Sequence, residues 1–284
     1  MSVKVMLQKT IKCGNYSLEF GKRTMLMGII NVTPDSFSDG GRFFDSKVAI
    51  SHAKRLAKEG ADIIDIGGES TRPGSEPVTS EEEQMRVIPV IEGIADEVEV
   101  PISIDTCKSE VAKAALDAGA CMINDISATR FDPKIVDVAA QNNVPIILMH
   151  MKGTPKDMQR DPTYGSLIDD IKEFLRERID FVQSKGVKRA SIIVDPGIGF
   201  GKTTEHNYEI IRRLGDFKEL ELPILIGTSR KSFIGNTLGL DVNERLEGTL
   251  ATITMCIMNG ADIIRVHDVK EVQRAARMTD AIYR

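Results

Sequence analysis

The fold is best indicated by one stretch of the sequence, Ser191-Ile-Ile-Val-Asp-Pro-Gly-Ile-Gly-Phe-Gly-Lys202. Its first residues form a short apolar run, which is typical of a buried strand. Asp195 stands where this strand ends, and three glycines follow at alternate positions. Because glycine carries no bulky side chain, such a loop lets a ligand approach the backbone closely. The stretch therefore predicts a strand that delivers a carboxylate to a binding site.

The same order of features recurs along the chain: an apolar run, a polar residue at its end, a loop rich in glycine or serine, and a helical pattern. The runs are apolar almost throughout, as parallel strands covered on both faces are. Eight such units over about 250 residues predict an α/β fold, the (β/α)8 or TIM barrel. The expected strands are Met25–Val32, Asp62–Ile66, Pro101–Asp105, Cys121–Ile126, Pro145–His150, Ser191–Asp195, Pro223–Gly227 and Ala261–His267. A doubly wound sheet is the alternative.

A weak internal repeat supports the barrel. Gly60-Ala-Asp-Ile-Ile64 recurs at Gly260-Ala-Asp-Ile-Ile264, in each case between a helical pattern and a strand. No proline-rich linker divides the sequence, so we expect a single domain, 1–284, with an N-terminal β-hairpin in 1–23 and the barrel in 24–284.

The hairpin is expected from alternating apolar residues on either side of a turn. The turn falls at Cys13-Gly14-Asn15-Tyr16, with strands at Val3–Leu7 and Ser17–Phe20.

Composition excludes several classes of protein. The chain is 42% apolar and 28% charged, as globular domains are, and its formal charge of -5 argues against a nucleic-acid partner. Its four cysteines contain no Cys-x-x-Cys pair, so neither a zinc site nor a disulfide framework is expected. Reduced thiols predict a cytoplasmic protein. The N-terminus lacks the apolar segment of a signal peptide, and no apolar run approaches ~18 residues, so no membrane span is expected.

Strand parity predicts which side chains meet. Side chains two residues apart share one face of a strand. The outer face of a barrel packs on apolar helices, so the faces that carry polar residues should point inward. Polar strand ends would then converge at the C-terminal mouth, where barrel enzymes hold their active sites. These ends are Asn31, Asp65, Asp105, Asn124, Asp195, the Arg230-Lys231 pair, and Arg265 with His267.

Asp105, Asn124 and Asp195 form a first candidate site. Carboxylates accept paired N–H bonds, and an amide both donates and accepts, so the three can hold the edge of a flat heterocycle. The alternative for each is a helix cap, because Asp and Asn commonly occupy that position.

Asn31, Arg265 and His267 form a second candidate site. The arginine and the imidazole make a compact anion site, and the Asn31 oxygen suits Mg²⁺ that bridges phosphates. A core histidine bonded to backbone is the alternative for His267.

Three loops are expected on the same side of the barrel as these two candidate sites. Gly227-Thr-Ser-Arg-Lys-Ser232 can bind a carboxylate or phosphate, or can simply begin a helix with solvated cations. The loops 33–42 and 68–77 are long enough to be lids, or else exposed surface loops. The spacing Gly197-x-Gly199-x-Gly201 matches neither the dinucleotide fingerprint nor the Walker loop.

Together these segments resemble the bacterial dihydropteroate synthases over nearly the whole chain. The resemblance rests on several motifs jointly, with no disruptive departure at any of them. They are Met27-Gly-Ile-Ile-Asn-Val-Thr-Pro-Asp-Ser-Phe-Ser-Asp-Gly40, Asp65-Ile-Gly-Gly-Glu-Ser-Thr-Arg-Pro-Gly74, Ile104-Asp-Thr106, Asn124-Asp-Ile126, Met149-His-Met-Lys-Gly-Thr-Pro155, Asp195-Pro-Gly-Ile-Gly-Phe-Gly-Lys202, Gly227-Thr-Ser-Arg-Lys-Ser232 and Arg265-Val-His267.

The resemblance implies a transferase that condenses 6-hydroxymethyl-7,8-dihydropterin diphosphate with 4-aminobenzoate, giving 7,8-dihydropteroate and diphosphate for folate biosynthesis. It also implies Mg²⁺ as cofactor, a homodimer and a sulfonamide target. By motif, the pterin residues would be Asp105, Asn124, Ile126, Met149, Asp195, Phe200, Gly227 and Lys231. The diphosphate residues would be Asn31, Arg265 and His267, with Asn31 also on the metal. The 4-aminobenzoate residues would be Phe37, Thr71, Arg72, Pro73, Lys231 and Ser232, beside a catalytic loop with Asp35 and Ser36.

Two alternatives share the barrel. A pterin-dependent methyltransferase would use the first site but would not need the Arg265-His267 anion site. A non-catalytic pterin-binding paralogue would not need intact lid loops. The helical pattern over Glu244–Met258 is apolar on more than one face, which favours a homodimer independently of the resemblance.

Overall fold

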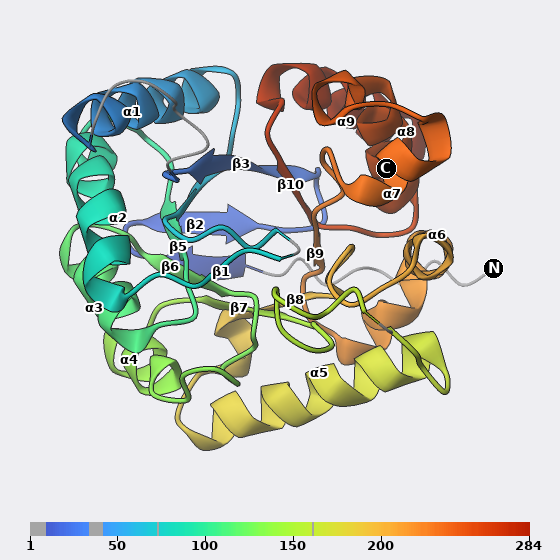
Figure 1. Ribbon diagram of the computed structural model, residues 1–284, viewed down its shortest axis with the longest axis horizontal. Helices are drawn as coiled ribbons and strands as arrows, with labels where there is room; N and C mark the ends of the chain where they lie inside the picture. Colours follow the sequence, from blue (N-terminus) through green and yellow to red (C-terminus); the bar gives the residue numbers. More distant parts are fainter. Residues whose placement is uncertain (1–9, 34–41, 73, 161) are drawn as a thin grey trace.

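The computed structural model describes residues 10–33, 42–72, 74–160 and 162–284, and these form one parallel barrel that helices surround (Figure 1). The strands run in the order β8-β7-β6-β5-β4-β3-β10-β9, and a bridge between Val194 and Ile224 joins β8 to the start of β9. This confirms the predicted (β/α)8 fold. The strands are β3 (Met25–Asn31), β4 (Ile63–Gly67), β5 (Ile102–Asp105), β6 (Met122–Asp125), β7 (Ile146–Met149), β8 (Ile192–Asp195), β9 (Leu225–Ile226) and β10 (Ile263–Val266).

The helices lie outside this ring (Figure 1). Thr79 caps the second of them, since its hydroxyl accepts from the Glu82 N–H. The helices are α1 (Arg42–Lys58), α2 (Ser80–Ala95), α3 (Ser109–Asp117), α4 (Ile135–Asn142), α5 (Leu167–Ser184), α6 (Thr204–Arg212), α7 (Ser232–Leu238), α8 (Leu246–Met258) and α9 (Val269–Tyr283). No helix of the described part is long and apolar enough to cross a membrane.

Two separate hydrophobic clusters confirm the strand parity. Alternate strand residues such as Ile192 and Val194 pack outward, in one cluster with the helices. The residues between them point into the barrel and pack with the hairpin. We call this inner cluster the barrel floor; it comprises Ile11, Cys13, Leu18, Phe20, Met25, Met27, Ile63, Cys121, Met122, Ile147, Ile193, Leu225 and Ile263.

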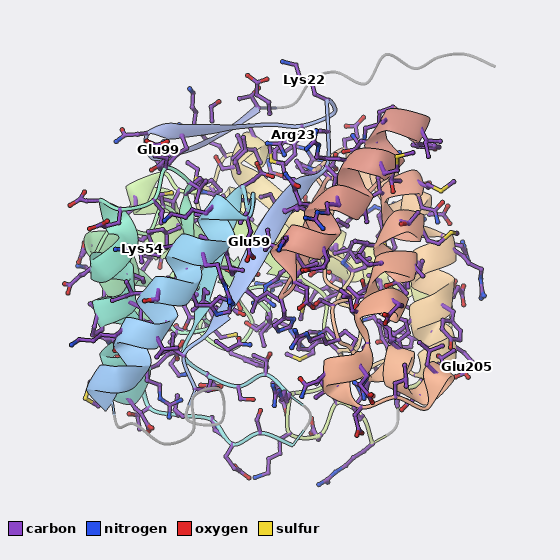
Figure 2. All side chains as sticks on the ribbon, turned by 90° about the horizontal axis from the view of Figure 1, so that it is seen from above. Lys22, Arg23, Lys54, Glu59, Glu99 and Glu205 are labelled. Atoms are coloured by element: carbon purple, nitrogen blue, oxygen red, sulfur yellow. The ribbon has the colours of Figure 1, made fainter. Side chains whose placement is uncertain are left out.

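The N-terminal hairpin closes the floor end of the barrel. It consists of β1 (Thr10–Cys13) and β2 (Tyr16–Glu19), joined by the predicted turn at Gly14 and Asn15. The strand that pairs next to this turn is therefore 10–13, while the expected strand Val3–Leu7 lies outside the described residues. Figure 2 shows the hairpin, near Lys22 and Arg23, at one end of the barrel, with described loops that follow the strands at the opposite end.

Candidate active site

The strand ends at the mouth of the barrel bring the predicted polar residues together. Asp105 and Asn124 are register partners on adjacent strands, and Met149 and Asp195 are partners on the next pair. Their side chains share the inward parity of Met122 and the other floor residues below them. Polar groups thus stand directly above an apolar floor.

Arg265 joins two of the acids. Its Nε donates to Asp65 Oδ2 at 2.6 Å, and a terminal nitrogen donates to Asp105 Oδ2 at 2.7 Å. The Asn124 amide also donates to Asp65 Oδ2 at 3.0 Å. Asp65 is fully buried, and its Oδ1 has no partner among the described residues. Asp65 therefore organises the site, although the sequence analysis left it outside the candidate site.

The acids of the mouth resist ionisation. Burial raises the pKa of Asp105 to about 7, against the opposing effect of Arg265, and the nearby Asp65 raises it further. Burial likewise raises the pKa of Asp195 to about 6, while the Gly197 N–H and Lys231 oppose this. Both carboxylates are thus shielded from water by burial, which favours a ligand that donates hydrogen bonds to them.

The glycine-rich loop after β8 fits tightly against the end of β7. Gly197 has a φ of +73°, and a Cβ there would lie 1.9 Å from the His150 carbonyl oxygen. At Gly201 a Cβ would lie 2.4 Å from the Lys152 carbonyl oxygen. At these two positions glycine is required by neighbouring protein backbone, rather than by a ligand as the sequence analysis proposed. The packing fixes Asp195, whose Oδ1 accepts from the Gly197 N–H at 2.7 Å.

A second group of residues forms an apolar wall beside the acids. It contains the predicted Ile126, Met149 and Phe200, and also two methionines that the prediction missed, Met151 and Met158. We call these five residues the apolar slot. Its apolar side chains suit the face of a flat ring, whose polar edge would meet the acids. Met151 lies two residues beyond Met149, so alternation was a usable signal, whereas Met158 lies in an irregular loop that carried none.

Lys231 connects the slot to the acids. Its ammonium group lies 4.1 Å from the centre of the Phe200 ring. Burial and the charge of Arg265 lower its pKa to about 8. Its neighbour Arg230 takes a different role, since it has a φ of +57° and its Nε donates to Asp268 at 3.0 Å. Of the predicted cation pair, only Lys231 faces the slot.

His267 lies at the end of β10 beside a serine that the prediction missed. Ser229 Oγ is 3.0 Å from His267 Nδ1 and also accepts from the His267 backbone N–H at 3.3 Å. Burial, with the charge of Arg265, lowers the pKa of His267 to about 3, so the ring is neutral at pH 7. A neutral imidazole held on one nitrogen leaves the other available for a ligand.

The remaining predicted residues lie at the rim or outside the described part. Asn31, Thr71, Gly227 and Lys231 are half-buried, whereas Arg72 and Ser232 are exposed. Exposure thus increases from the slot outward. Four predicted residues lie outside the described residues: Asp35, Ser36, Phe37 and Pro73.

The loop after β4, one of the two expected lids, is tied at its root and near its tip. Lys108 pairs with Glu69 of the loop and, at 2.5 Å, with the buried Glu83 of α2. Further along, the Gly74 N–H donates to the Pro155 carbonyl at 3.0 Å. These bonds hold the loop against the β7 loop, so it is not an independent surface segment.

Buried Lys202 supports the base of the site and was also missed as a functional residue. Its Nζ lies 2.9 Å from His150 Nδ1 and donates to the Phe200 carbonyl at 3.0 Å. Burial lowers its pKa well below the ordinary value. Lys202 thus fixes the loop that carries Phe200 to the end of β7.

Known proteins resemble this chain over nearly its whole length. Residues 27–267 match the family described as pterin binding enzyme. The dihydropteroate synthase of Clostridium beijerinckii is 52% identical over 276 residues, which cover 96% of this chain and 100% of that protein.

Solved structures agree in fold as well as in sequence. A dihydropteroate synthase from Clostridium difficile, solved with pteroic acid, is 50% identical with a TM-score of 0.89 and covers 94% of this chain and 99% of its own. One from Xanthomonas albilineans, solved with 4-aminobenzoic acid, is 42% identical with a TM-score of 0.91 and covers 97% and 98%. With a family match over residues 27–267 and relatives about half identical over nearly the whole chain, this chain belongs to the pterin-binding enzymes and, among them, to the dihydropteroate synthase family.

Proposed function

We propose that the mouth of this barrel condenses 6-hydroxymethyl-7,8-dihydropterin diphosphate with 4-aminobenzoate, with its own acids and apolar slot holding the pterin. The observation that carries this proposal is the juxtaposition of the Asp105, Asn124 and Asp195 strand ends with the slot. A pterin has one polar edge that donates N–H bonds and two apolar faces. The edge fits the buried carboxylates of Asp105 and Asp195, and the faces fit Met149 and Phe200.

The acids also suit the chemistry. When diphosphate leaves, the exocyclic carbon of the pterin becomes cation-like. Asp195, buried and ionised above pH 6, favours that charge electrostatically. The aromatic amine of 4-aminobenzoate is already a nucleophile, so the reaction requires no strong general base.

The departing diphosphate would bind Arg265, His267 and Asn31. Among the described residues the Arg265 guanidinium donates two of its five possible hydrogen bonds to acids, so donors remain for phosphate oxygens. Neutral His267 can donate from the ring nitrogen that Ser229 does not contact.

Mg²⁺ fits this arrangement as a partner of the substrate. No group of three metal-binding side chains occurs in the described part of the chain, so the described residues alone offer no complete set of ligands. Mg²⁺ commonly keeps waters and binds substrate phosphates with one or two protein oxygens. The half-buried Asn31 amide would supply one, and the ion would neutralise diphosphate charge.

The second substrate would bind at the rim, at Thr71, Arg72, Lys231 and Ser232, together with Phe37 and Pro73. The cations suit its carboxylate, and their greater exposure suits a substrate that enters after the pterin. The loops, including Asp35 and Ser36, would exclude water, which otherwise captures the cation-like carbon.

A turnover assay tests the reaction. Pure protein with pterin diphosphate, 4-aminobenzoate and Mg²⁺ should release dihydropteroate; absence of product would favour the non-catalytic paralogue. Transfer of a methyl group from a pterin would favour the methyltransferase instead. Asp195→Asn should weaken binding of a pterin analogue by about 1–3 kcal/mol. Unchanged affinity in that variant would remove Asp195 from the pterin site.

We propose that the chain works as a cytoplasmic homodimer. Apolar side chains remain exposed on adjacent helices α8 and α9: Met255 by 45%, Met258 by 42%, Met278 by 62% and Ile282 by 75%. Figure 1 shows these helices together on one side of the barrel. Light scattering should give a dimer, and Ile282→Asp should dissociate it. The four thiols are free, as in a reducing compartment.

We also propose that sulfonamides bind at the rim. A dihydropteroate synthase from Yersinia pestis that is 42% identical to this chain has been solved with a sulfonamide drug. The drug class resembles 4-aminobenzoate, so it should compete with that substrate in the turnover assay.

A further inference from the structure

Two thiols meet at the opposite end of the barrel from the active site. Cys13 ends strand β1 of the hairpin, and Cys121 immediately precedes strand β6. Their Sγ atoms are 2.9 Å apart, and Cys13 Sγ lies 3.0 Å from the Cys121 carbonyl oxygen. Both cysteines are free, and they are separated by 108 positions in the sequence. No residue of the proposed reaction touches either one in the described structure.

The surrounding structure holds the two sulfurs together. Cys13 is fully buried and Cys121 is 9% exposed, and both belong to the barrel floor. The turn residue Gly14, with a φ of +57°, lies so close that a Cβ there would be 3.2 Å from Cys121 Cβ. The hairpin therefore holds the Cys13 sulfur beside the Cys121 sulfur.

The two thiols differ in their protonation. The hydrogen bond between them raises the pKa of Cys13 and lowers the pKa of Cys121. These opposite shifts make Cys121 the more readily ionised of the two thiols. Cys121 is both the better nucleophile and the more exposed of the two.

We propose that Cys13 and Cys121 form an oxidation site, in which a peroxide converts the two thiols into a disulfide that fastens the hairpin to the barrel floor. The Cys121 thiolate attacks one peroxide oxygen, so an S–O bond forms, the O–O bond breaks and hydroxide leaves. The Cys13 sulfur then attacks the resulting sulfenic acid; the S–S bond forms and the hydroxyl group leaves as water with the Cys13 proton. The thiols lose two electrons, and the peroxide gains them.

A metal site explains the pair less well. Two thiolates on a tetrahedral zinc ion, each at about 2.3 Å from the metal, stand nearly 4 Å apart. The sulfurs here are closer than that, and the described residues include no third metal-binding side chain beside them.

The cross-link would stabilise the fold and leave the mouth unchanged. A two-stranded hairpin is only marginally stable by itself. A disulfide between residues 108 positions apart restricts the unfolded chain strongly, so Tm should rise by roughly 5–10 °C. Asn124, the nearest mouth residue in sequence, is at the other end of β6.

The test uses the intact protein with Cys107→Ser and Cys256→Ala, a double variant that keeps only the pair. Dilute hydrogen peroxide at neutral pH should remove two hydrogens from one molecule, and peptide mapping should find residues 13 and 121 joined. Dithiothreitol should reverse both the mass change and the rise in Tm. Cys13→Ser in the same background should instead accumulate the Cys121 sulfenic acid, which dimedone traps.

Three results would overturn the proposal. The pair could stay reduced under excess peroxide, Cys121 could proceed to sulfinic acid in the double variant, or the disulfide could join two different molecules. Wild-type protein provides the comparison, since Cys107 and Cys256 should remain reduced while the pair reacts. Burial raises the pKa of both of those thiols, which makes them poor nucleophiles.

Discussion

The two ends of the barrel are built from the same strands but on opposite principles. At the floor, Met27, Met122 and Ile193 pack against the hairpin with no charge among them. At the mouth, two residues further along β8, the Asp195 carboxylate is also buried, and its Oδ1 accepts a hydrogen bond from the Gly197 N–H. Successive inward positions of one strand thus hold Ile193, whose burial stabilises the fold, and Asp195, whose burial costs stability.

The difference shows where the binding energy for a ligand comes from. Burying apolar surface at the floor stabilises the barrel by about 25 cal/mol per Å². Burying Asp105 and Asp195 opposes their ionisation, as their raised pKa values show. The floor therefore stabilises the barrel, whereas the carboxyl groups of the mouth gain more stabilisation from a bound ligand than from the rest of the protein. The predictions below test this division, beginning with the largest expected effect.

Arg265→Ala should have the largest effect. It leaves fully buried Asp65 and nearly buried Asp105 without their shared cation. Breaking a buried ion pair on one side typically costs about 3–5 kcal/mol, so the free energy of unfolding should fall by that much. Turnover should also be lost. Urea denaturation measures the first effect, and the dihydropteroate assay measures the second.

The control is Lys113→Ala, which removes an ion pair with Asp117 on the exposed surface of α3. Such a pair contributes about 0.3–0.5 kcal/mol. If Arg265→Ala costs no more than this control, the acids are not held by Arg265, and the description of the mouth is wrong.

Asp195→Asn should stabilise the protein while it weakens pterin binding. The folded-state pKa of Asp195, about 6, exceeds the ordinary 3.8, so the folded state holds the proton more tightly than the unfolded state does. The difference in free energy of unfolding, wild type minus variant, should therefore fall as pH rises from about 4 to about 6. It should stay level above that. The change should be on the order of 1–3 kcal/mol. The Asn oxygen can still accept from Gly197.

Paired urea denaturations at pH 4, 5, 6 and 7 measure this difference. Because the wild type and the variant share all their other titrating groups, the effects of those groups cancel in the difference. This includes His267, whose lowered pKa has the opposite effect on stability. A difference that does not vary with pH would show that Asp195 is ionised normally in the folded protein.

Much of the contrast between the apolar floor and the polar mouth could be predicted from the sequence. The strands are buried on both faces, so apolar runs marked them, and parity placed Met27, Met122 and Ile193 on the inward face that also carries the polar strand ends. Parity also placed Asp105 beside Asn124, because parallel strands in a barrel align residues of like orientation. Ile126, Met149 and Phe200 came from resemblance to the family, and the structure brings them together.

The partners of each charge could not be predicted. Asp65 was visible as a polar strand end, but a helix cap and a buried ion-pair partner look alike in sequence. Whether Arg265 reaches it depends on how far adjacent strands are offset around the barrel. For the same reason Arg230 was paired with Lys231 as a site cation, whereas its left-handed backbone turns it toward Asp268.

Binding of 4-aminobenzoate should depend on the first substrate's diphosphate. The loop 33–42 is rich in Gly, Ser and Pro, so ordering it costs conformational entropy that the first ligand bears. The second ligand would then meet a prepared rim at Thr71 and Arg72. Calorimetry should show affinity increased by about 1–3 kcal/mol when diphosphate and Mg²⁺ are present, and Mg²⁺ alone is the control. Equal affinity in both titrations would mean that the rim is already formed.

Ile193→Val should give the smallest effect, and it tests the division on the strand that also carries Asp195. Ile193 is fully buried in the floor, and removing one methyl group from such a position typically costs about 0.5–1.5 kcal/mol. The free energy of unfolding should fall by that amount at every pH. Affinity for a pterin analogue should not change, because Ile193 packs with the hairpin residues of the floor and only the next inward residue, Asp195, belongs to the mouth. If affinity falls along with stability, packing at the floor sets the position of the carboxylate, and the two ends of the barrel act as one unit.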